Sequence, residues 1–348
     1  MNSMRKIYDL NFEELSAYLE SIGEKKFRAK QIYAWLYKKR VTSFDEMTDI
    51  KKELIEKLKE EFVIDICEEV TRQVSHDGTI KFLFKMDDGS LVESVLMVFD
   101  YGYSACISTQ VGCNMGCTFC ASGLLKKVRN LSSGEIFGQL LKIQMHLDES
   151  GGRLGNIVVM GTGEPFDNYD NTMKALAMAN DPQALEIGAR HISISTSGLI
   201  PSIERFSKEQ VQYNLAISLH APNDELRSRL MPVNKAYPLK DLMAALKDYS
   251  ELNNRRLTFE YLLLDGVNNS EENADELKQL LKGMNAYVNL IPYNSVDEND
   301  YKSVSDKKAL QFYDMLKKRG IAVTLRQKKG DDIDAACGQL RAKHSKGK

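Results

Sequence analysis

Long apolar runs are missing from this sequence of 348 residues. It contains no stretch of about 18 apolar residues, the length at which a segment becomes a candidate for crossing a membrane. Its first residues, MNSMRKIYDLNFEEL, are charged and amphipathic, unlike a secretory signal. We therefore expect a cytoplasmic protein that does not bind membranes and is large enough for one α/β domain with an appendage.

An excess of charge of one sign is also absent, because 47 Lys and Arg stand against 49 Asp and Glu. This balance argues against a uniformly basic nucleic-acid binder. One local exception is the stretch 23–40, in which seven basic residues accompany a single acid, Glu24. Ile32, Trp35 and Leu36 are spaced to pack one helix face while the cations point outward. The stretch is either a solvated helix with an ordinary core face or a contact for nucleic-acid phosphates.

Cysteines are few, six in all, and three of them fall in CNMGCTFC as Cys113, Cys117 and Cys120. In a reducing compartment such a cluster indicates metal ligands or reactive thiols rather than disulfides. A structural zinc site usually needs a second pair of ligands, which the sequence lacks, although Cys106 could be a fourth ligand. A four-iron cluster held by three thiolates would leave one iron open for another ligand.

Apolar, strand-like runs alternate with helix-like stretches after the cysteine cluster. The expected strands cover 156–161, 191–196, 213–220, 256–264, 286–293 and 321–326, and the clearest helices cover 135–147, 239–252 and 274–284. This alternation predicts βα units around a parallel sheet, in an open or partial barrel. Before the cluster, short helices precede a strand-rich region in which Asp88-Gly89 predicts a hairpin turn.

Polar residues follow several of these strands, at the edge where ligands of such folds gather. In GTGEP, Gly161 and Gly163 precede Glu164 and would let the backbone approach a ligand closely. The other candidates are Ser195, Ser218, Leu219, His220 and Asn294. A serine or asparagine there could equally cap the following helix. For the histidine, a structural role or a cofactor contact is favoured over acid-base catalysis.

Three more cysteines lie outside the cluster. Cys67 is interpreted as a small buried hydrophobic residue. Cys106 lies on a predicted strand, whereas Cys337 follows a polar run and precedes a glycine, which predicts an accessible loop. Two accessible thiols that meet at a barrel mouth would permit covalent catalysis followed by disulfide formation.

The spacing C-x3-C-x2-C, with an aromatic residue before the last cysteine, resembles the motif of the radical S-adenosylmethionine (radical SAM) superfamily. The resemblance implies one [4Fe-4S] cluster per chain, bound by Cys113, Cys117 and Cys120, with an open iron that binds SAM. It also implies that Gly163 and Glu164 contact SAM. The remainder of the implied SAM pocket is Ser195, Ser218, Leu219, His220 and Asn294.

Six motifs, CNMGCTFC, GTGEPFDN, STSGLIP, SLHAPND, LMPVN and DIDAACGQLR, together resemble the RlmN/Cfr family of RNA adenine methyltransferases over nearly the whole chain. The resemblance implies methylation of adenine C2 in 23S ribosomal RNA (rRNA), at the peptidyl-transferase centre, and in transfer RNA (tRNA) next to the anticodon. Two SAM molecules would be used per turnover. Methylation of C8, as in the Cfr branch, is the alternative, and Pro165 in GEPFDN favours C2.

The same resemblance implies catalytic roles for Cys337, Cys106 and Glu93. Cys337 would become S-methylcysteine, transfer a methylene group to adenine, and be released when it forms a transient disulfide with Cys106. Glu93, in SLVESVL, maps onto the family's proton acceptor, where apolar neighbours would favour uptake of a proton. It could instead be an exposed strand residue, with Cys106 as the base.

The organisation of the chain also follows from the resemblance. Residues 1–62 would form a helical RNA-binding domain, 63–98 a strand-rich extension, 99–336 a partial (β/α)6 radical SAM barrel, and 337–348 a tail with the methyl-accepting cysteine. The expected RNA contacts are the basic stretch from Lys25 to Arg40 together with Arg326, Lys328 and Lys329. A flavodoxin or ferredoxin-type electron donor and a monomeric state are expected.

Two other classes of protein remain open from the residues alone. A radical SAM enzyme of another kind would keep the cluster but would not need Cys337. A non-catalytic RNA-binding protein would hold zinc at the three clustered cysteines.

Overall fold

The computed structural model describes residues 4–64, 67–124, 126–294, 299–327, 329–330 and 332–333. Cys337, Lys328 and the expected tail 337–348 lie outside the described residues. Among the described helices, none is long and apolar enough to cross a membrane.

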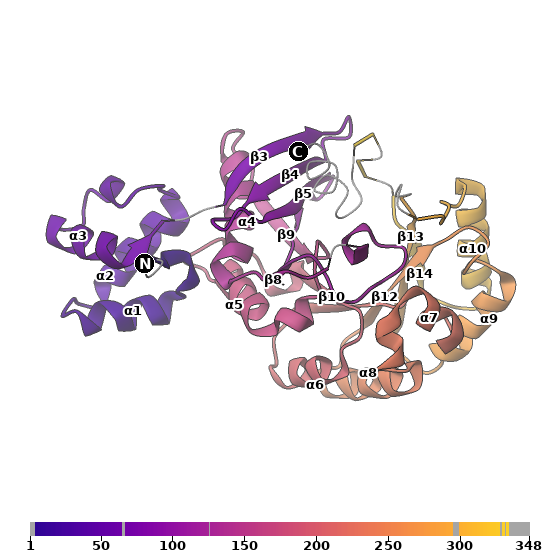
Figure 1. Cartoon of the computed structure of the whole chain (residues 1–348). Helices are drawn as coiled ribbons and strands as arrows, with labels where there is room; N and C mark the ends of the chain where they lie inside the picture. Colours follow the sequence, from indigo (N-terminus) through magenta and orange to yellow (C-terminus); the bar gives the residue numbers. More distant parts are fainter. Residues whose placement is uncertain are drawn as a thin grey trace.

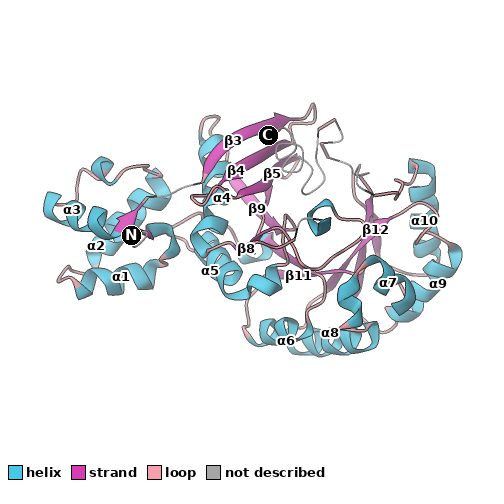
Figure 2. Ribbon diagram, viewed as in Figure 1, coloured by secondary structure: helices cyan, strands magenta, loops and turns pink. Residues whose placement is uncertain are grey.

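One ten-stranded sheet forms the centre of the molecule (Figures 1 and 2), in the order β14-β13-β12-β11-β10-β9-β6-β5-β4-β3. Its strands are β3 (Glu68–Val74), β4 (Ile80–Lys85), β5 (Leu91–Phe99), β6 (Gly102–Cys106), β9 (Leu154–Val159), β10 (Ile192–Thr196), β11 (Asn214–Ser218), β12 (Leu257–Leu263), β13 (Ala286–Pro292) and β14 (Val323–Leu325). From β6 to β14 all neighbours are parallel, which confirms the predicted sheet. Strands β3, β4 and β5 extend the same sheet in antiparallel order, so the region before the cluster adds strands rather than a second layer.

Helices cover the outer side of the parallel strands, as Figure 2 shows. They are α4 (Ser133–Asp148), α5 (Tyr169–Asn180), α6 (Ile200–Lys208), α7 (Asp224–Leu230), α8 (Leu239–Asn253), α9 (Glu271–Leu280) and α10 (Asp306–Lys318), with short 3-10 helices η5 (Pro165–Asn168), η6 (Ala189–His191) and η7 (Pro232–Lys235). Helix α4 begins at Ser132, whose side chain accepts a hydrogen bond from the Glu135 N–H in a capping box. The apolar runs form strands because both faces are covered, and Ile194, Ile217 and Phe259 are fully buried.

The Asp88-Gly89 turn joins β4 to β5 as predicted. The Ser90 N–H donates to Asp88 Oδ1 at 2.9 Å, and Gly89 has a φ of +81°, which glycine adopts without strain. The hairpin fixes the register of β4 and β5, and β5 contributes Val95 and Met97 to the site described below.

The N-terminal segment forms a separate group of short elements beside α4 and α5 (Figure 1). These are β1 (Arg5–Lys6), η1 (Ile7–Asp9), α1 (Phe12–Ser21), α2 (Phe27–Tyr33), a π-helix η2 (Ala34–Lys39), η3 (Phe44–Glu46), α3 (Lys52–Glu61) and β2 (Phe62–Val63). Ile32 and Leu36 are buried and Trp35 is partly buried, so the predicted amphipathic face is confirmed. The Tyr37 ring packs edge-on against Phe137 of α4 at 5.2 Å between centroids, which attaches this group to the sheet domain.

Candidate active site

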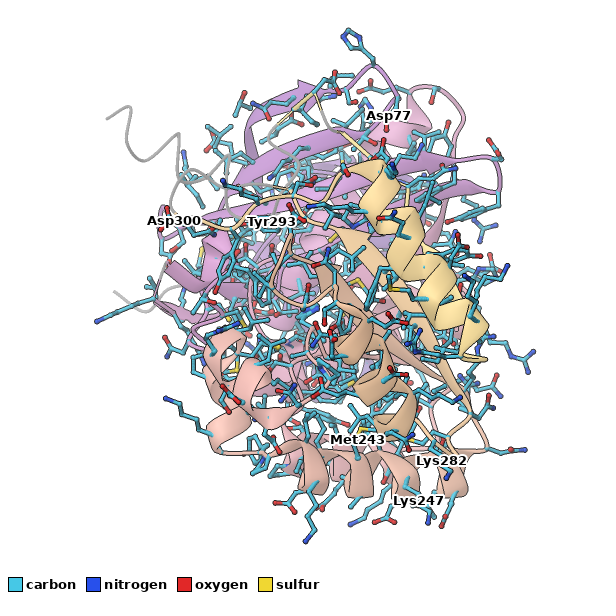
Figure 3. The ribbon with its side chains drawn as sticks, turned by 90° about the vertical axis from the view of Figure 1, so that its right-hand side faces the viewer. Asp77, Met243, Lys247, Lys282, Tyr293 and Asp300 are labelled. Carbon is cyan, nitrogen blue, oxygen red and sulfur yellow. The ribbon has the colours of Figure 1, made fainter. Side chains whose placement is uncertain are left out.

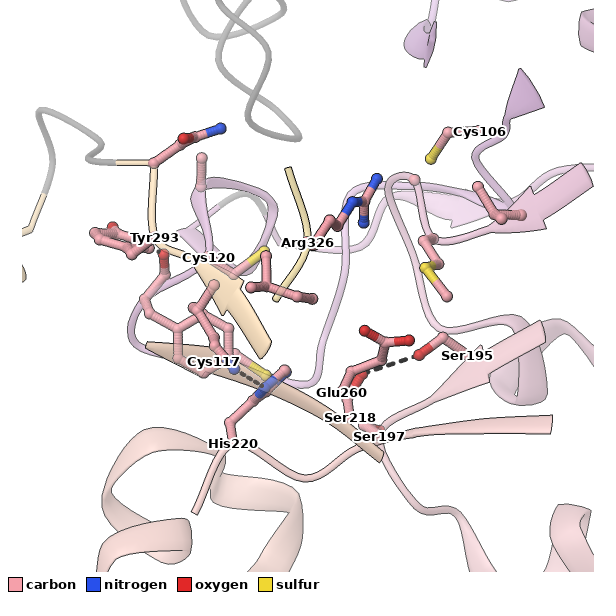
Figure 4. A pocket seen from close by; sticks show the side chains of 18 of the residues that line it. Cys106, Cys117, Cys120, Ser195, Ser197, Ser218, His220, Glu260, Tyr293 and Arg326 are labelled. Carbon is pink, nitrogen blue, oxygen red and sulfur yellow. Dashed lines mark hydrogen bonds between the residues drawn. The ribbon is translucent and has the colours of Figure 1, made fainter. Parts of the chain in front are cut away.

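The three clustered cysteines lie in one loop that is closed at its base by a short strand pair. Strand β7 (Gln110–Val111) pairs with β8 (Arg129–Asn130), and the loop between them contains the 3-10 helix η4 (Ala121–Leu124). Cys113, Cys117 and Cys120 are free thiols and line a cavity of about 360 Å³ (Figure 4). The loop therefore presents all three cysteines to one cavity.

Close backbone packing holds this loop in place. The Thr118 N–H donates to the carbonyl of Leu230, at the end of α7, at 2.9 Å. A Cβ added to Gly123 would lie 2.7 Å from the Cys117 carbonyl oxygen, so only glycine fits where the loop turns back on itself. The loop conformation is thus fixed by contacts that do not involve the sulfur atoms.

Burial disfavours the charged form of the loop thiols. It raises the pKa of Cys113 to about 12 and raises that of Cys117 well above its usual value. A thiolate in such a place needs a positive partner, and bound metal supplies one. Across the described ranges, no three His, Cys, Asp or Glu side chains converge closely enough to hold a single metal ion. Three thiolates from one short loop match the ligand set of a multi-iron cluster with one open iron, whereas a structural zinc ion takes four ligands.

The GTGEP segment follows β9 and forms the floor of the cavity, where Gly163 and Glu164 both line it. The Glu164 carboxylate is buried and accepts hydrogen bonds from the backbone N–H groups of Phe166 at 3.1 Å and Ser197 at 2.8 Å. Burial nevertheless raises the pKa of Glu164. The carboxylate therefore ties the end of β9 to the end of β10.

The two glycines of GTGEP also allow close packing within the chain. A Cβ on Gly161 would lie 2.6 Å from the Ile107 carbonyl oxygen, and a Cβ on Gly163 would lie 2.7 Å from the Gln110 side chain. They let this segment pack closely against the backbone that follows β6, in addition to any contact with a ligand. Gly163, with a φ of +111°, also needs a backbone conformation that side chains disfavour.

Most of the polar residues predicted at strand ends line the cavity. Ser195 of β10 and Ser218 of β11 lie within hydrogen-bond distance, 3.1 Å between their hydroxyl oxygens, and Asn294 follows β13. Neither serine caps a helix, because the N-caps of α6 and α7 are Leu199 and Asn223.

Leu219, also predicted in the SAM pocket, does not line the cavity with its side chain. Its side chain is fully buried in the apolar core, on the other side of the chain from Ser218. Successive residues of an extended chain point to opposite faces, so only one of these two neighbours can reach the cavity.

His220 lines the cavity as a neutral packing group. Its Nδ1 accepts a hydrogen bond from the Leu262 N–H at 3.0 Å, and its ring meets Phe119 edge-on at 5.0 Å between centroids. Burial, with a smaller contribution from the positive charge of Arg227, lowers the pKa of His220 to about 3. The imidazole is thus uncharged near neutral pH, in agreement with a cofactor contact or structural role.

Cys106 ends β6 and points into the same cavity as Cys117 and Cys120 (Figure 4). Burial raises the pKa of its thiol, and the positive charge of Arg326 counteracts part of this effect. The predicted disulfide partner of Cys106 is Cys337, which lies outside the described residues.

Glu93 lies on β5, two residues before the lining residue Val95, and is not itself among the residues that line the cavity. Its carboxylate is only 4% exposed and forms an ion pair with Lys81 of β4, whose side chain is fully buried, at 3.0 Å. The alternative of an exposed strand glutamate is therefore wrong. Val95 and Cys106 are paired across β5 and β6, so Glu93, two residues before Val95, shares the sheet face that bears the Cys106 thiol.

Two charged residues of the cavity's far wall were not predicted to lie there. Glu260, on β12, is buried, and its carboxylate accepts a hydrogen bond from Asn289 Nδ2 at 2.8 Å. Burial raises the pKa of Glu260, while Arg326 lowers it. Arg326, expected only as an RNA contact, also points into the cavity (Figure 4). A single acid inside an apolar strand was the one hint that Glu260 faces a site.

The chain after β14 returns across the sheet to the turn between β3 and β4. Asp77, labelled in Figure 3, accepts a hydrogen bond from the Gly330 N–H at 3.2 Å. The Asp332 carboxylate accepts hydrogen bonds from the Ser75 hydroxyl and the His76 N–H. This anchor holds the chain five residues before Cys337.

Comparisons with known proteins agree with this geometry. The family model of the "Ribosomal RNA large subunit methyltransferase N-terminal domain" matches residues 6–64, and that of the "Radical SAM superfamily" matches residues 107–277. A crystal structure of a radical SAM methyltransferase from Sphaerobacter thermophilus superposes with a TM-score of 0.93 at 42% identity, over 96% of this chain and 98% of that one.

Two curated relatives carry the name "Probable dual-specificity RNA methyltransferase RlmN". The protein from Oceanobacillus iheyensis is 54% identical over 99% of this chain and 98% of its own length. That from Streptococcus agalactiae serotype Ia is 56% identical over 97% of this chain and 93% of its own length. The chain is more than half identical to these relatives over nearly its full length, and its cysteine loop lines a cavity as the superfamily requires. It therefore belongs to the RlmN family of radical SAM RNA methyltransferases.

Proposed function

We propose that this chain methylates carbon C2 of adenine in 23S rRNA and in tRNA, by radical chemistry that uses a methylated cysteine. The observation that carries the proposal is the place of Cys106, whose thiol lines the same cavity as the cysteine loop. A second thiol beside the cluster loop is not needed to hold a cluster with three ligands. It is needed if a covalent link to the product must be broken by disulfide formation.

The cavity fits the group that the superfamily implies. Cys113, Cys117 and Cys120 would hold a [4Fe-4S] cluster, and SAM would lie between it and the strand ends that bear Glu164 and Ser195. When bound, the cluster and SAM supply a methyl group and a carbon radical.

The chain's own thiols and acids perform the remaining steps. Cys337 carries the methyl group, and after loss of one hydrogen atom its methylene carbon bonds to adenine C2. Glu93 or Cys106 removes the C2 proton. The Cys106 sulfur then bonds to the Cys337 sulfur while the bond between the Cys337 sulfur and the methylene carbon breaks. The carbon takes up a proton and becomes the methyl group of the product, and the unpaired electron left by the radical addition would return to the cluster. A flavodoxin or ferredoxin-type protein supplies electrons, and a thiol reductant resets the disulfide.

The choice between the two bases depends on access. Cys106 lines the cavity directly, whereas Glu93 is not among the lining residues and is paired with Lys81. In this arrangement Glu93 would act through Cys106 or after a small rearrangement of β5. Cys106 is the proton acceptor nearer to an adenine placed in the cavity.

Mass spectrometry of the peptide that contains Cys337 tests the proposal. We expect one added methyl group in wild-type protein and an RNA adduct on Cys337 in Cys106→Ala, because the link can no longer be released. Cys67→Ala is the matched control, since Cys67 is buried away from the cavity. An unmodified Cys337 together with full turnover by Cys337→Ala would refute the mechanism.

Two further measurements separate the parts of the proposal. Anaerobically prepared wild-type protein should contain about four irons per chain, and Cys117→Ala should lose them. Digestion of the methylated RNA then identifies the modified carbon, and a methyl group at C8 would refute the assignment to C2. We also propose a cytoplasmic monomer, which sedimentation of the purified chain would check.

A further inference from the structure

An exposed pair of stacked aromatic rings stands at the turn between β5 and β6. The rings of Phe99 and Tyr101 are 4.9 Å apart between centroids and inclined by only 7°. Tyr101 is 71% exposed, although a tyrosine is a large side chain that folding usually covers at least in part. The outer ring therefore offers a flat aromatic face to solvent.

This aromatic pair continues the wall of the catalytic cavity. Val95 and Met97 of β5 line the cavity, and Phe99 is the next residue on the same face of the strand. Its partner across the ladder is Gly102, which has no side chain to cover the Phe99 ring, and a Cβ added there would meet only open space. The pair thus lies at the rim, about two strand residues outward from the lining.

Two positively charged side chains lie near the aromatic pair, on its cavity side. The Lys329 ammonium lies 5.3 Å from the centroid of the Phe99 ring, and Arg326 reaches Met97, with 3.5 Å between the guanidinium and the sulfur. Asp77 offsets part of this charge, because one of its carboxylate oxygens is 3.8 Å from the Lys329 ammonium. Aromatic faces beside cations are the combination that binds single-stranded nucleic acid, where bases stack and phosphates pair with the cations.

We propose that Phe99 and Tyr101 form a stacking platform for the nucleobase next to the target adenine, with Lys329 and Arg326 facing the flanking phosphates. This inference rests on the proposed function, since it takes RNA as the substrate. A target base must leave its stack to enter the cavity, and the neighbour that it leaves behind loses a stacking partner. A platform at the rim replaces that lost partner, which lowers the cost of extruding the adenine.

Three full-length variants test the platform: Tyr101→Ala, Tyr101→Phe and, as a control, Leu252→Ala. Leu252 is 69% exposed on α8, whose residues Met243 and Lys247 lie far from Asp77 and the β3–β4 turn in Figure 3. The probe is an unmodified transcript of the peptidyl-transferase region of 23S rRNA. Dissociation constants come from titration, and KM and kcat from methylation assays of the reconstituted enzyme.

Tyr101→Ala should weaken RNA binding about 5-fold to 150-fold, the range for loss of one base-aromatic stack, and should raise KM by a similar factor with little change in kcat. Tyr101→Phe keeps the ring and should bind like wild type, as should Leu252→Ala. Unchanged binding by Tyr101→Ala, with an active wild type, would overturn the platform alone. A wild type that methylates no RNA would instead overturn the proposed function. Self-association of the chain through Tyr101, detected as a dimer that Tyr101→Ala abolishes, would also overturn the platform.

Discussion

Replacing Lys81 with methionine tests the buried ion pair behind Cys106. The Lys81 ammonium and the Glu93 carboxylate are 3.0 Å apart, with 0% and 4% of their side chains exposed. Methionine keeps most of the length and volume of lysine but removes the charge. The Glu93 carboxylate then remains buried without the ammonium that compensates it.

The size of the effect follows from this burial. Removing one partner of a buried ion pair costs about 3–5 kcal/mol of the free energy of unfolding. A chain of 348 residues unfolds with an entropy of about 0.7 kcal/mol/K, so the melting temperature should fall by about 4–7 °C. The double variant Lys81→Met/Glu93→Leu should recover most of this loss, because an apolar pair of similar volume can replace a buried ion pair without cost.

Thermal unfolding monitored by fluorescence measures these shifts in all variants under one condition. Lys85→Met is the matched control, since Lys85 lies on the same strand and pairs with Glu68, but their side chains are 45% and 63% exposed. An exposed pair contributes at most about 1 kcal/mol, so the control should lose no more than about 1.5 °C. If the double variant lost as much as the sum of both single variants, the pair would not be coupled and the reasoning would be wrong.

Two further predictions concern the strand ends. Gly161→Ala should cost about 1–3 kcal/mol of the free energy of unfolding in denaturant titrations, because the added Cβ would lie 2.6 Å from the Ile107 carbonyl oxygen. Gly155→Ala, on β9 six residues before Gly161, should be nearly neutral, since its Cβ would meet the Tyr103 carbonyl oxygen at an ordinary 3.8 Å, and equal losses in both variants would contradict the packing argument. His220 makes stability depend on pH: its folded pKa of about 3 lies below the unfolded value of about 6.5, so its contribution is complete above pH 6.5 and is lost as pH falls toward 3. Between pH 7 and 5 wild type should therefore lose about 2 kcal/mol more than His220→Gln in urea unfolding, and identical losses would show that the imidazole is not held neutral.

Local sequence determined the elements and the cluster loop. Three cysteines within eight residues can face one space in almost any fold, because the short loop keeps them together. The strand predictions succeeded because runs such as that of β11 are apolar on both faces, and helix starts such as Ser132 carry their own capping signal. The family motifs added the expected SAM contacts, most of which line one cavity.

Tertiary structure decided which neighbours face that cavity. Leu219 was predicted beside Ser218, but a step of one residue turns a side chain to the opposite face, and nothing in SLHAPND states which face is covered. Glu93 could be exposed or buried until β4 brought Lys81 to its side, a contact that exists only after the β4–β5 hairpin has its register. Glu260, the Phe99 and Tyr101 platform and the anchor of the chain before Cys337 likewise depend on pairs far apart in sequence. Spacing along the chain specifies local geometry, whereas burial and charge pairing are set only when distant strands meet.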